Sequence, residues 1–242
     1  MSQKKISWKP GNMVYPVPAV MVTAADKEGN SNIITVAWTG TVCTNPPMAY
    51  ISVRPERHSY SMLKETGEFV INLTTEELAY ATDYCGVRSG RDVDKWKETG
   101  LTPQAASKVS VPLIAESPVS IECRVTEVKE LGSHHMFLAD VVAVDVDEQW
   151  MNESGKLELS RANLMVYSHG EYYGLSKLLG TFGYSIQKDG KKMQKTAAER
   201  TRKKVQKTAS KKTQEKVQKT APKQTRKKTQ RAAQTTPKTR QK

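Results

Sequence analysis

Residues 119–146 read VSIECRVTEVKELGSHHMFLADVVAVDV, and apolar and polar side chains alternate along both halves of this stretch. The two halves, Val119–Val128 and Met136–Val146, are separated by Glu130-Leu131-Gly132-Ser133, which suits a turn. A period of two is typical of strands with one face in a core and the other toward solvent. The stretch therefore predicts two long, half-buried antiparallel strands.

Shorter strand and helix patterns flank this pair. The predicted strands cover Val20–Ala25, Asn32–Trp38, Met48–Val53, Glu68–Leu73 and Leu164–Ser168. The predicted helices cover Ser59–Glu65 and Asp92–Thr99, and another opens at Thr74, which has the capping-box spacing to Glu77. Gly29 and Asn30 favour a hairpin between the first two strands. Strands outnumber helices, which favours a closed or split antiparallel β-barrel over a βαβ fold.

The positive charge of the chain is concentrated at its end. The 242 residues have a net charge of +13, yet residues 188–242 alone hold 21 basic and 3 acidic residues. The first 187 residues are therefore mildly acidic. We predict one globular domain over residues 1–187, a common single-domain size, and a separate tail over residues 188–242.

The tail is built from a repeat of 12 residues. KKMQKTA begins at Lys191, KKVQKTA at Lys203 and EKVQKTA at Glu215. On a helix this period turns the repeated apolar residue to a new direction each time, so no apolar stripe forms. We predict disorder, because such a composition buries too little apolar area. The tail is either a solvated extension or a non-specific ligand of nucleic acid or another polyanion, and without aromatic residues after Tyr184 it is unsuited to stacking on bases.

Several classes of protein are disfavoured by missing motifs. The chain opens without an export signal, and no apolar run is long enough to span a membrane. The three cysteines lie far apart in the sequence, which argues against a disulfide framework and favours a reducing compartment, the cytoplasm. Neither dinucleotide-binding glycines, a phosphate loop, nor a serine-nucleophile elbow is present. The four histidines do not form a metal-binding motif, so we expect no metal site.

Polar residues gather where the Met48–Val53 strand leads to a helix. Ser52, Arg54, His58 and Ser59 lie within eight residues, and together with the free N–H groups of a helix start they would suit a phosphate. Alternatively, Arg54 caps a loop or pairs with Glu56. The neighbouring His134 and His135 point to opposite sides of their strand, so only one can face a given site.

Six segments of the chain, in order, resemble the flavin reductase-like family of FMN-binding split barrels, the group that includes flavoredoxin. These segments are SNIITVAWTG (31–40), TNPPMAYISVRPERHSY (44–60), EFVINL (68–73), SGRDVDKW (89–96), LGSHHMFLADVVAV (131–144) and EYYGLSKLLGTFGYS (171–185). The resemblance runs from about Met13 to Ser185 and leaves out the tail. It implies a mainly β fold, an antiparallel split barrel of Greek-key type with a few short helices.

The resemblance also implies a homodimer with FMN near the subunit interface. Carried over to this sequence, the cofactor-binding residues are Asn32, Thr35, Val36, Ala37, Trp38, Ser52, Arg54, His58, Ser59, Lys95, His134 and Tyr167. Reduction of a flavin places negative charge on one edge of its ring, and a cation or an oriented donor there stabilises the reduced form. Lys95 and His134 are the candidates for that role, and no residue is assigned with certainty to catalysis.

Three functions are compatible with these features. The resemblance favours an NAD(P)H-dependent flavin reductase that passes electrons to free flavin, a partner protein or ferric iron. The alternative is a flavoredoxin-like electron carrier without efficient NAD(P)H oxidation. In the third, the basic tail anchors a flavin-bound barrel on nucleic acid. The sequence offers no marker for NADH against NADPH, for the electron acceptor, for the flavin potential or for a redox role of Cys43 or Cys85.

Overall fold

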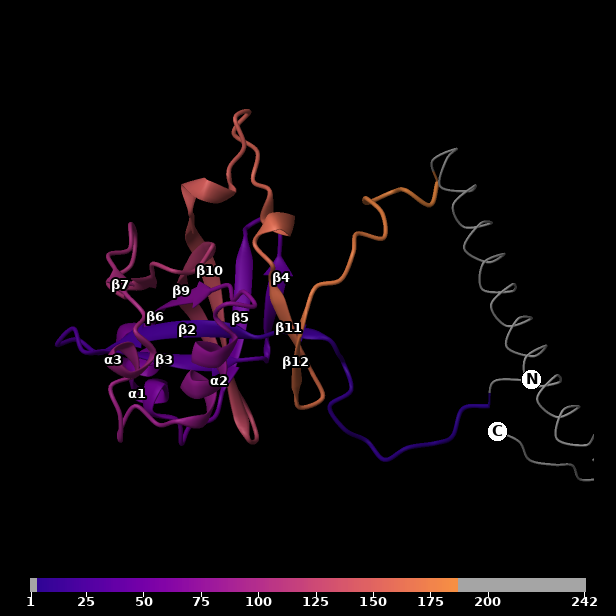
Figure 1. Cartoon of the computed structure of the whole chain (residues 1–242). Coiled ribbons are helices and arrows are strands. Elements are labelled where there is room, and N and C mark those ends of the chain that lie inside the picture. The colour runs from indigo at the N-terminus through magenta and orange to yellow at the C-terminus, as the bar shows by residue number, and fades with distance from the viewer. Residues whose placement is uncertain (1–3, 187–242) are drawn as a thin grey trace, which may run out of the picture. The chain divides into compact units, whose positions relative to one another are not determined.

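A computed structural model describes residues 4–186, and its main feature is a seven-stranded antiparallel sheet (Figure 1). The order in the sheet is β3-β2-β6-β9-β10-β5-β4. These strands are β2 (Val20–Ala25), β3 (Ser31–Val36), β4 (Thr39–Cys43), β5 (Met48–Val53), β6 (Glu68–Asn72), β9 (Val119–Leu131) and β10 (His134–Val146). A smaller sheet has the order β1-β11-β12, with β1 (Val17–Pro18), β11 (Met165–Ser168) and β12 (Glu171–Gly174).

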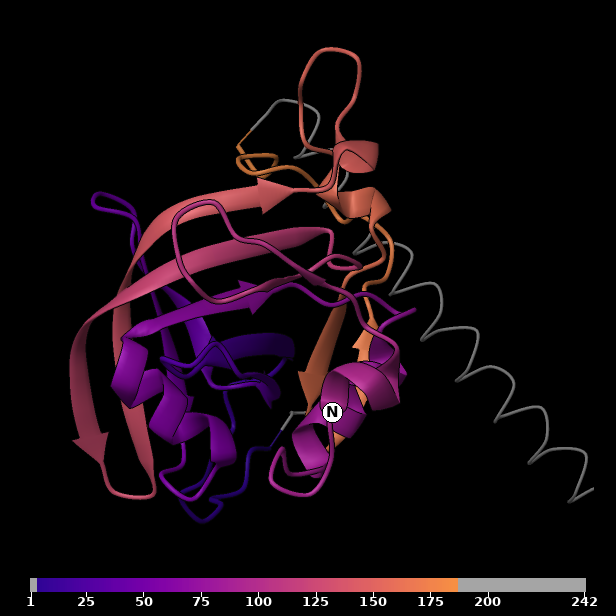
Figure 2. The ribbon, with the colours of Figure 1, turned by 90° about the vertical axis from the view of Figure 1, so that its left-hand side faces the viewer.

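The large sheet curls into a split barrel because its two edges are adjacent in the chain. β3 and β4 lie at opposite edges of the strand order, yet only Ala37 and Trp38 separate them. At this corner the Ser52 N–H donates to the Trp38 carbonyl at 2.8 Å, which ties the corner to β5. The curled sheet is visible in Figure 2. The predicted fold class, a mainly β antiparallel split barrel, is confirmed.

The two long predicted strands, β9 and β10, are neighbours in the middle of the strand order. β9 and β10 pair antiparallel over most of their length, with irregularities between Leu138 and Ala139 and between Val141 and Ala143. Both strands extend further toward the turn than predicted, because only Gly132 and Ser133 connect them. Gly132 has a φ of 68°, which glycine adopts without the strain a side chain would cause. The predicted strand over Asn32–Trp38, by contrast, ends at Val36.

Alternate residues of β2 belong to two different cores. Val20, Val22 and Ala24 point into the barrel, which α1 (His58–Thr66) closes at one end with Met62 and Leu63. Met21 points the other way, into a second core shared with α2 (Ala79–Val87). β2 is therefore buried on both faces, and the helices are held close to the barrel edge.

The helix ends show which sequence signals were decisive. α1 is ended by Gly67 and α3 (Lys95–Thr99) by Gly100, both in the left-handed conformation. α3 begins three residues later than predicted, because Asp94 caps it by accepting a hydrogen bond from the Lys97 N–H at 3.3 Å.

The capping box predicted at Thr74 is wrong. α2 begins at Ala79, and the Thr74 hydroxyl donates instead to the Ala19 carbonyl, next to β2. Thr75 forms an isolated β-bridge with Leu164. This stretch is therefore drawn into strand-like contacts, and tertiary hydrogen bonds override the local helix signal.

The remaining elements are short. β7 (Pro103–Gln104) pairs with β8 (Leu113–Ile114), and single 3-10 turns cover Glu148–Trp150 and Leu159–Arg161. The elements described here belong to a compact unit over Met1–Lys177. No helix within residues 4–186 has the length and apolar character needed to cross a membrane. The predicted disordered tail over residues 188–242 lies outside the described residues.

Candidate functional site

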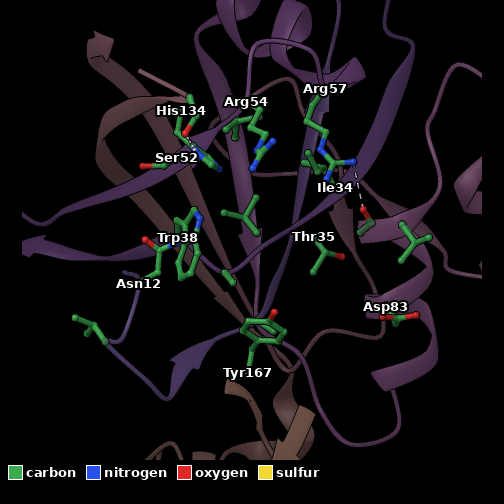
Figure 3. A pocket seen from close by; sticks show the side chains of 18 of the residues that line it. Asn12, Ile34, Thr35, Trp38, Ser52, Arg54, Arg57, Asp83, His134 and Tyr167 are labelled. Atoms are coloured by element: carbon green, nitrogen blue, oxygen red, sulfur yellow. Dashed lines mark hydrogen bonds between the residues drawn. The ribbon is translucent and has the colours of Figure 1, made fainter. Parts of the chain in front are cut away.

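An open cavity of about 960 Å³ lies at the corner where β3 passes into β4, facing the end of β5. Figure 3 shows Arg54, Arg57 and His134 at one end of this cavity and Tyr167 at the other. Eight of the predicted cofactor-binding residues line it: Thr35, Val36, Ala37, Trp38, Ser52, Arg54, His134 and Tyr167. The barrel corner thus brings together side chains from β3, β5, β10 and β11.

A second cavity of about 310 Å³ adjoins the first. The two share Ile34, Arg54 and Arg57 in their walls. The remaining predicted residues line this smaller cavity: Asn32, His58, Ser59 and Lys95. The structure therefore gathers every predicted cofactor-binding residue along one cleft with two compartments.

The far end of the larger cavity is aromatic. The rings of Tyr167 and Tyr172 lie 5.6 Å apart, and Tyr15 packs against Tyr167 at 6.0 Å and Trp38 at 6.2 Å. The Tyr172 hydroxyl donates to an Asp83 carboxylate oxygen at 3.2 Å, and burial, the largest cause, raises the Tyr172 pKa to about 12. These walls suit a flat ring system that has a few polar atoms on its edge.

The smaller cavity is strongly cationic. The charged residues in its wall are Arg54, Arg57, Arg88, Arg91 and Lys95, against the single carboxylate of Glu56. α1 begins beside it without a capping side chain and without an acidic residue in its first turn. The positive end of the helix and its unpaired N–H groups add to the field of the arginines. No ion pair joins Arg54 to Glu56 in the part of the chain described, so this cluster is free to bind an anion such as phosphate.

A buried hydrogen bond fixes the floor of the cationic cavity. The Asn32 side-chain amide donates to the Ser59 hydroxyl oxygen at 2.7 Å, and the two residues are 5% and 0% exposed. Asn32 comes from β3 and Ser59 from the first turn of α1, so this bond joins the barrel to the helix start. The helix terminus is thereby held at a set distance from the sheet.

Lys95 lines the cationic cavity and not the aromatic one. Its ammonium donates to the carbonyls of Ile33 at 2.6 Å and Cys85 at 2.7 Å, and the residue is only 3% exposed. Burial lowers the Lys95 pKa to about 8. Lys95 and His134 were both expected at one edge of a bound ring, but they line different compartments. Lys95 lies with Arg54, His58 and Ser59, the residues predicted to bind phosphate.

His134 faces the larger cavity as a neutral side chain near pH 7. Its Nδ1 lies 3.0 Å from the Ser133 hydroxyl, and loss of hydration, followed by the charge of Arg54, lowers its pKa below the usual value. It can thus supply an oriented hydrogen bond, but not a full charge. His135 points away and meets the Tyr60 hydroxyl at 2.7 Å, which confirms that the adjacent histidines face opposite sides.

Sequence reasoning missed several residues of the cleft. Arg57, Arg88 and Arg91 extend the cationic wall, while Asp83 and Tyr172 form the hydrogen-bonded pair at the aromatic end. The repeated arginines in RPER and VRSGR were the available signal, but nothing local indicated that these two loops meet. They do so because the Arg91 guanidinium donates to the Glu56 carbonyl at 3.0 Å.

The chain resembles known proteins in both sequence and structure. The family profile described as flavin reductase like domain matches residues 12–176. Flavoredoxin of Desulfovibrio vulgaris (Miyazaki F) is similar in structure, with a TM-score of 0.71 and 27% identity over 76% of this chain and 100% of that chain. Flavoredoxin from Methanosarcina acetivorans has a TM-score of 0.67 and 26% identity, covering 74% of this chain and 95% of that one. A flavin reductase of Pseudomonas putida is 26% identical over 137 residues, which are 56% of this chain and 76% of that protein.

Proposed function

The chain belongs to the flavin reductase-like family, and on this premise we propose that it binds FMN in the two-part cleft and acts as an NAD(P)H-dependent flavin reductase. The observation that carries the proposal is the chemical difference between the two compartments of the cleft. Its large compartment ends in aromatic side chains packed edge to face, and its small compartment is lined by five cationic side chains beside an uncapped helix start. FMN has the same two parts, a flat ring system and one phosphate.

The residues present fit this cofactor. The ring would lie along Thr35–Trp38, with backbone groups toward its polar edge and Tyr167 at its far end. The phosphate would lie among Arg54, Ser59 and Lys95. Charge-assisted bonds from guanidinium and ammonium groups, together with helix N–H groups, are the usual partners of phosphate in proteins.

In this proposal the residues of the chain bind the FMN, orient it and shield it from solvent. When bound, FMN supplies the hydride and electron chemistry, so no general acid or base is required from the protein. His134 offers a neutral, oriented hydrogen bond in the larger compartment, and Asp83 fixes the Tyr172 hydroxyl on the wall. The open cavity has a volume of about 960 Å³, which is large enough for a nicotinamide ring to lie against the flavin ring.

The proposal is tested by the visible spectrum of the purified protein, followed by FMN titration and steady-state oxidation of NADH and of NADPH. Retained or titratable FMN, with turnover of a reduced nicotinamide nucleotide, is the expected result. Protein that stays colourless after incubation with excess FMN would refute the assignment.

The similarity to two flavoredoxins supports a second candidate, an electron carrier that exchanges electrons with a protein partner. The two candidates differ in the rate of nicotinamide oxidation. Tight FMN binding with negligible NADH and NADPH turnover, measured with and without added FMN, would favour the carrier over the reductase.

We also propose that the chain forms a homodimer, with its cleft beside the subunit interface. Support comes from exposed apolar side chains next to the cleft, since Met13 and Val14 line the larger cavity and are 62% and 85% exposed. Such side chains on a cavity rim are commonly covered by a partner. Light scattering of the purified protein would give the mass of a dimer, and a monomer mass would contradict this proposal.

A further inference from the structure

We propose that one face of α2 binds the adenosine half of a reduced nicotinamide dinucleotide, and that Asp83 on this face makes the protein prefer NADH to NADPH. The inference rests on the proposed function, because it takes the flavin ring to lie along β3 in the larger compartment. It chooses between the two electron donors that the proposed function leaves open.

Four side chains share the outer face of α2. They are Tyr80, Asp83, Tyr84 and Val87, spaced by three or four residues, as one side of a helix requires. Tyr80 and Val87 are 71% and 70% exposed. The rings of Tyr80 and Tyr84 stack, with centroids 6.0 Å apart and planes inclined by 28°. This pair offers an aromatic surface on which a nucleic base can stack.

The outer face of α2 is continuous with the larger cavity. Asp83 and Gly86 line that cavity. The Thr35 hydroxyl donates to the Thr82 carbonyl, and a Cβ added at Gly86 would lie 3.2 Å from the Thr35 Cβ, so the helix packs closely against β3. The proposed position of the flavin ring, along Thr35–Trp38, therefore borders α2. A donor whose nicotinamide lies against the flavin has the rest of its length within reach of this helix.

Asp83 is the one acidic side chain among the described residues that line the larger cavity. The Tyr172 hydroxyl donates to Asp83 Oδ1 at 3.2 Å, so the carboxylate is positioned from β12. Within residues 4–186, Asp83 forms no ion pair and its Oδ2 accepts no hydrogen bond. A carboxylate oxygen without a partner suits a ligand that donates hydrogen bonds, such as the hydroxyls of a ribose.

The order of the groups along α2 matches the order of the groups in a dinucleotide. Tyr80, Asp83 and Gly86 follow at intervals of three residues, about 4.5 Å along the helix axis. The Arg57 guanidinium donates to the Gly86 carbonyl at 3.4 Å, and Figure 3 shows Arg57 and Asp83 on the same side of the cavity. Adenine, ribose and pyrophosphate would thus meet an aromatic surface, a carboxylate and a guanidinium in turn. The nicotinamide would then extend past Arg57 toward the flavin.

The extra phosphate of NADPH is attached to the 2′ oxygen of the adenosine ribose. On this face it would replace a hydroxyl that donates to Asp83, and it would bring a dianion next to the carboxylate. Arg57 is the cation of the larger cavity that contacts α2, and the pyrophosphate engages it in both nucleotides. The 2′-phosphate is left beside Asp83, so NADH is expected to bind more tightly.

The test uses the full chain loaded with FMN. Steady-state oxidation gives kcat/KM for NADH and for NADPH, and calorimetric titration with NAD+ and with NADP+ measures binding without turnover. We expect NADH to be favoured at least about fivefold in kcat/KM, mainly through KM, and NAD+ to bind more tightly than NADP+ by a similar factor. A smaller preference, or one for NADPH, would overturn the role of Asp83. If FMN binds but neither nucleotide is oxidised, the reductase proposal fails, and this inference fails with it.

Two variants separate the charge from the aromatic surface. Asp83→Asn keeps the size of the side chain and removes its charge, so it should lower the preference for NADH at least about threefold, chiefly through a lower KM for NADPH. Tyr80→Ala should raise KM for both nucleotides at least about threefold and leave their ratio unchanged. The matched controls are Glu98→Gln and Tyr173→Ala, at exposed positions outside the larger cavity, and neither should alter these constants.

Two results with the variants would contradict the proposal. An Asp83→Asn protein with the wild-type preference for NADH would refute the role of the carboxylate, and unchanged KM values in Tyr80→Ala would refute the aromatic surface. A change of molecular mass in either variant, measured by light scattering, would assign this face of α2 to a subunit contact and would likewise overturn the proposal.

Discussion

Replacing Lys95 tests whether the small compartment binds phosphate. Lys95 is nearly fully buried, and two backbone carbonyls accept hydrogen bonds from its ammonium. Lys95→Met keeps most of the side-chain volume and removes the charge. The matched control is Lys97→Met on the same helix, because Lys97 is exposed and lines neither compartment.

The size of the effect follows from the pKa of this lysine. Burial lowers it from 10.5 to about 8. Because one pKa unit corresponds to about 1.4 kcal/mol, the compartment disfavours the charged form by about 3 kcal/mol. A bound phosphate dianion offsets this cost by raising the Lys95 pKa again. Lys95→Met should therefore weaken FMN binding by up to about 3 kcal/mol, or roughly 100-fold in Kd.

The pH dependence of binding has a definite sign. The ammonium is charged below pH 8 and favours the phosphate, and it is lost in the free protein as the pH rises above about 8. FMN affinity should be steady from pH 7 to 8 and then fall by up to about tenfold per pH unit. Fluorescence titrations over pH 7–9.5 measure this, with Lys95→Met expected to show a flat profile. A flat profile in the wild-type protein, or unchanged affinity in Lys95→Met, would refute this account of the site.

Three further predictions concern the site, the core and the tail. Arg54→Ala should weaken FMN binding by about 1.5–3 kcal/mol, as expected for a lost charge-assisted bond, and an unchanged titration would remove Arg54 from the site. Glu122 is fully buried and accepts hydrogen bonds from Ser107, Lys108 and Val109. Glu122→Gln should lower the free energy of unfolding by about 3 kcal/mol in thermal melts, whereas the exposed Glu127→Gln should change it by less than about 0.5 kcal/mol, and equal effects would contradict this role. Truncation before Lys191 should leave the melting temperature and flavin content nearly unchanged and abolish any salt-sensitive binding of polyanions, because the composition of the repeats offers little apolar area for a core. A truncated chain that unfolds or loses flavin would move the domain boundary.

Much of the barrel was predictable because its signals are local. Alternation along β9 and β10 indicates strands whatever their partners are, and glycines such as Gly67 and Gly100 end helices through their own conformational freedom. The resemblance to flavin-binding barrels likewise located Asn32 and Ser59 by matching residues in sequence. None of these signals indicated that the Asn32 amide bonds the Ser59 hydroxyl.

Other features of the fold and the site depend on contacts between segments that are distant in the sequence, and only the tertiary structure shows them. The helix signal at Thr74 failed because the hydroxyl found a carbonyl 55 residues away in the chain, next to β2. Lys95 is separated from His134 because its ammonium is held by the carbonyls of Ile33 and Cys85, in the smaller compartment. The sequence by itself determined the strands and the residue types that can hold a phosphate. Packing between distant segments determined where the cleft is divided and which cations share a compartment. These packing contacts depend on the register and curvature of the sheet, and no periodic pattern in the sequence indicates them.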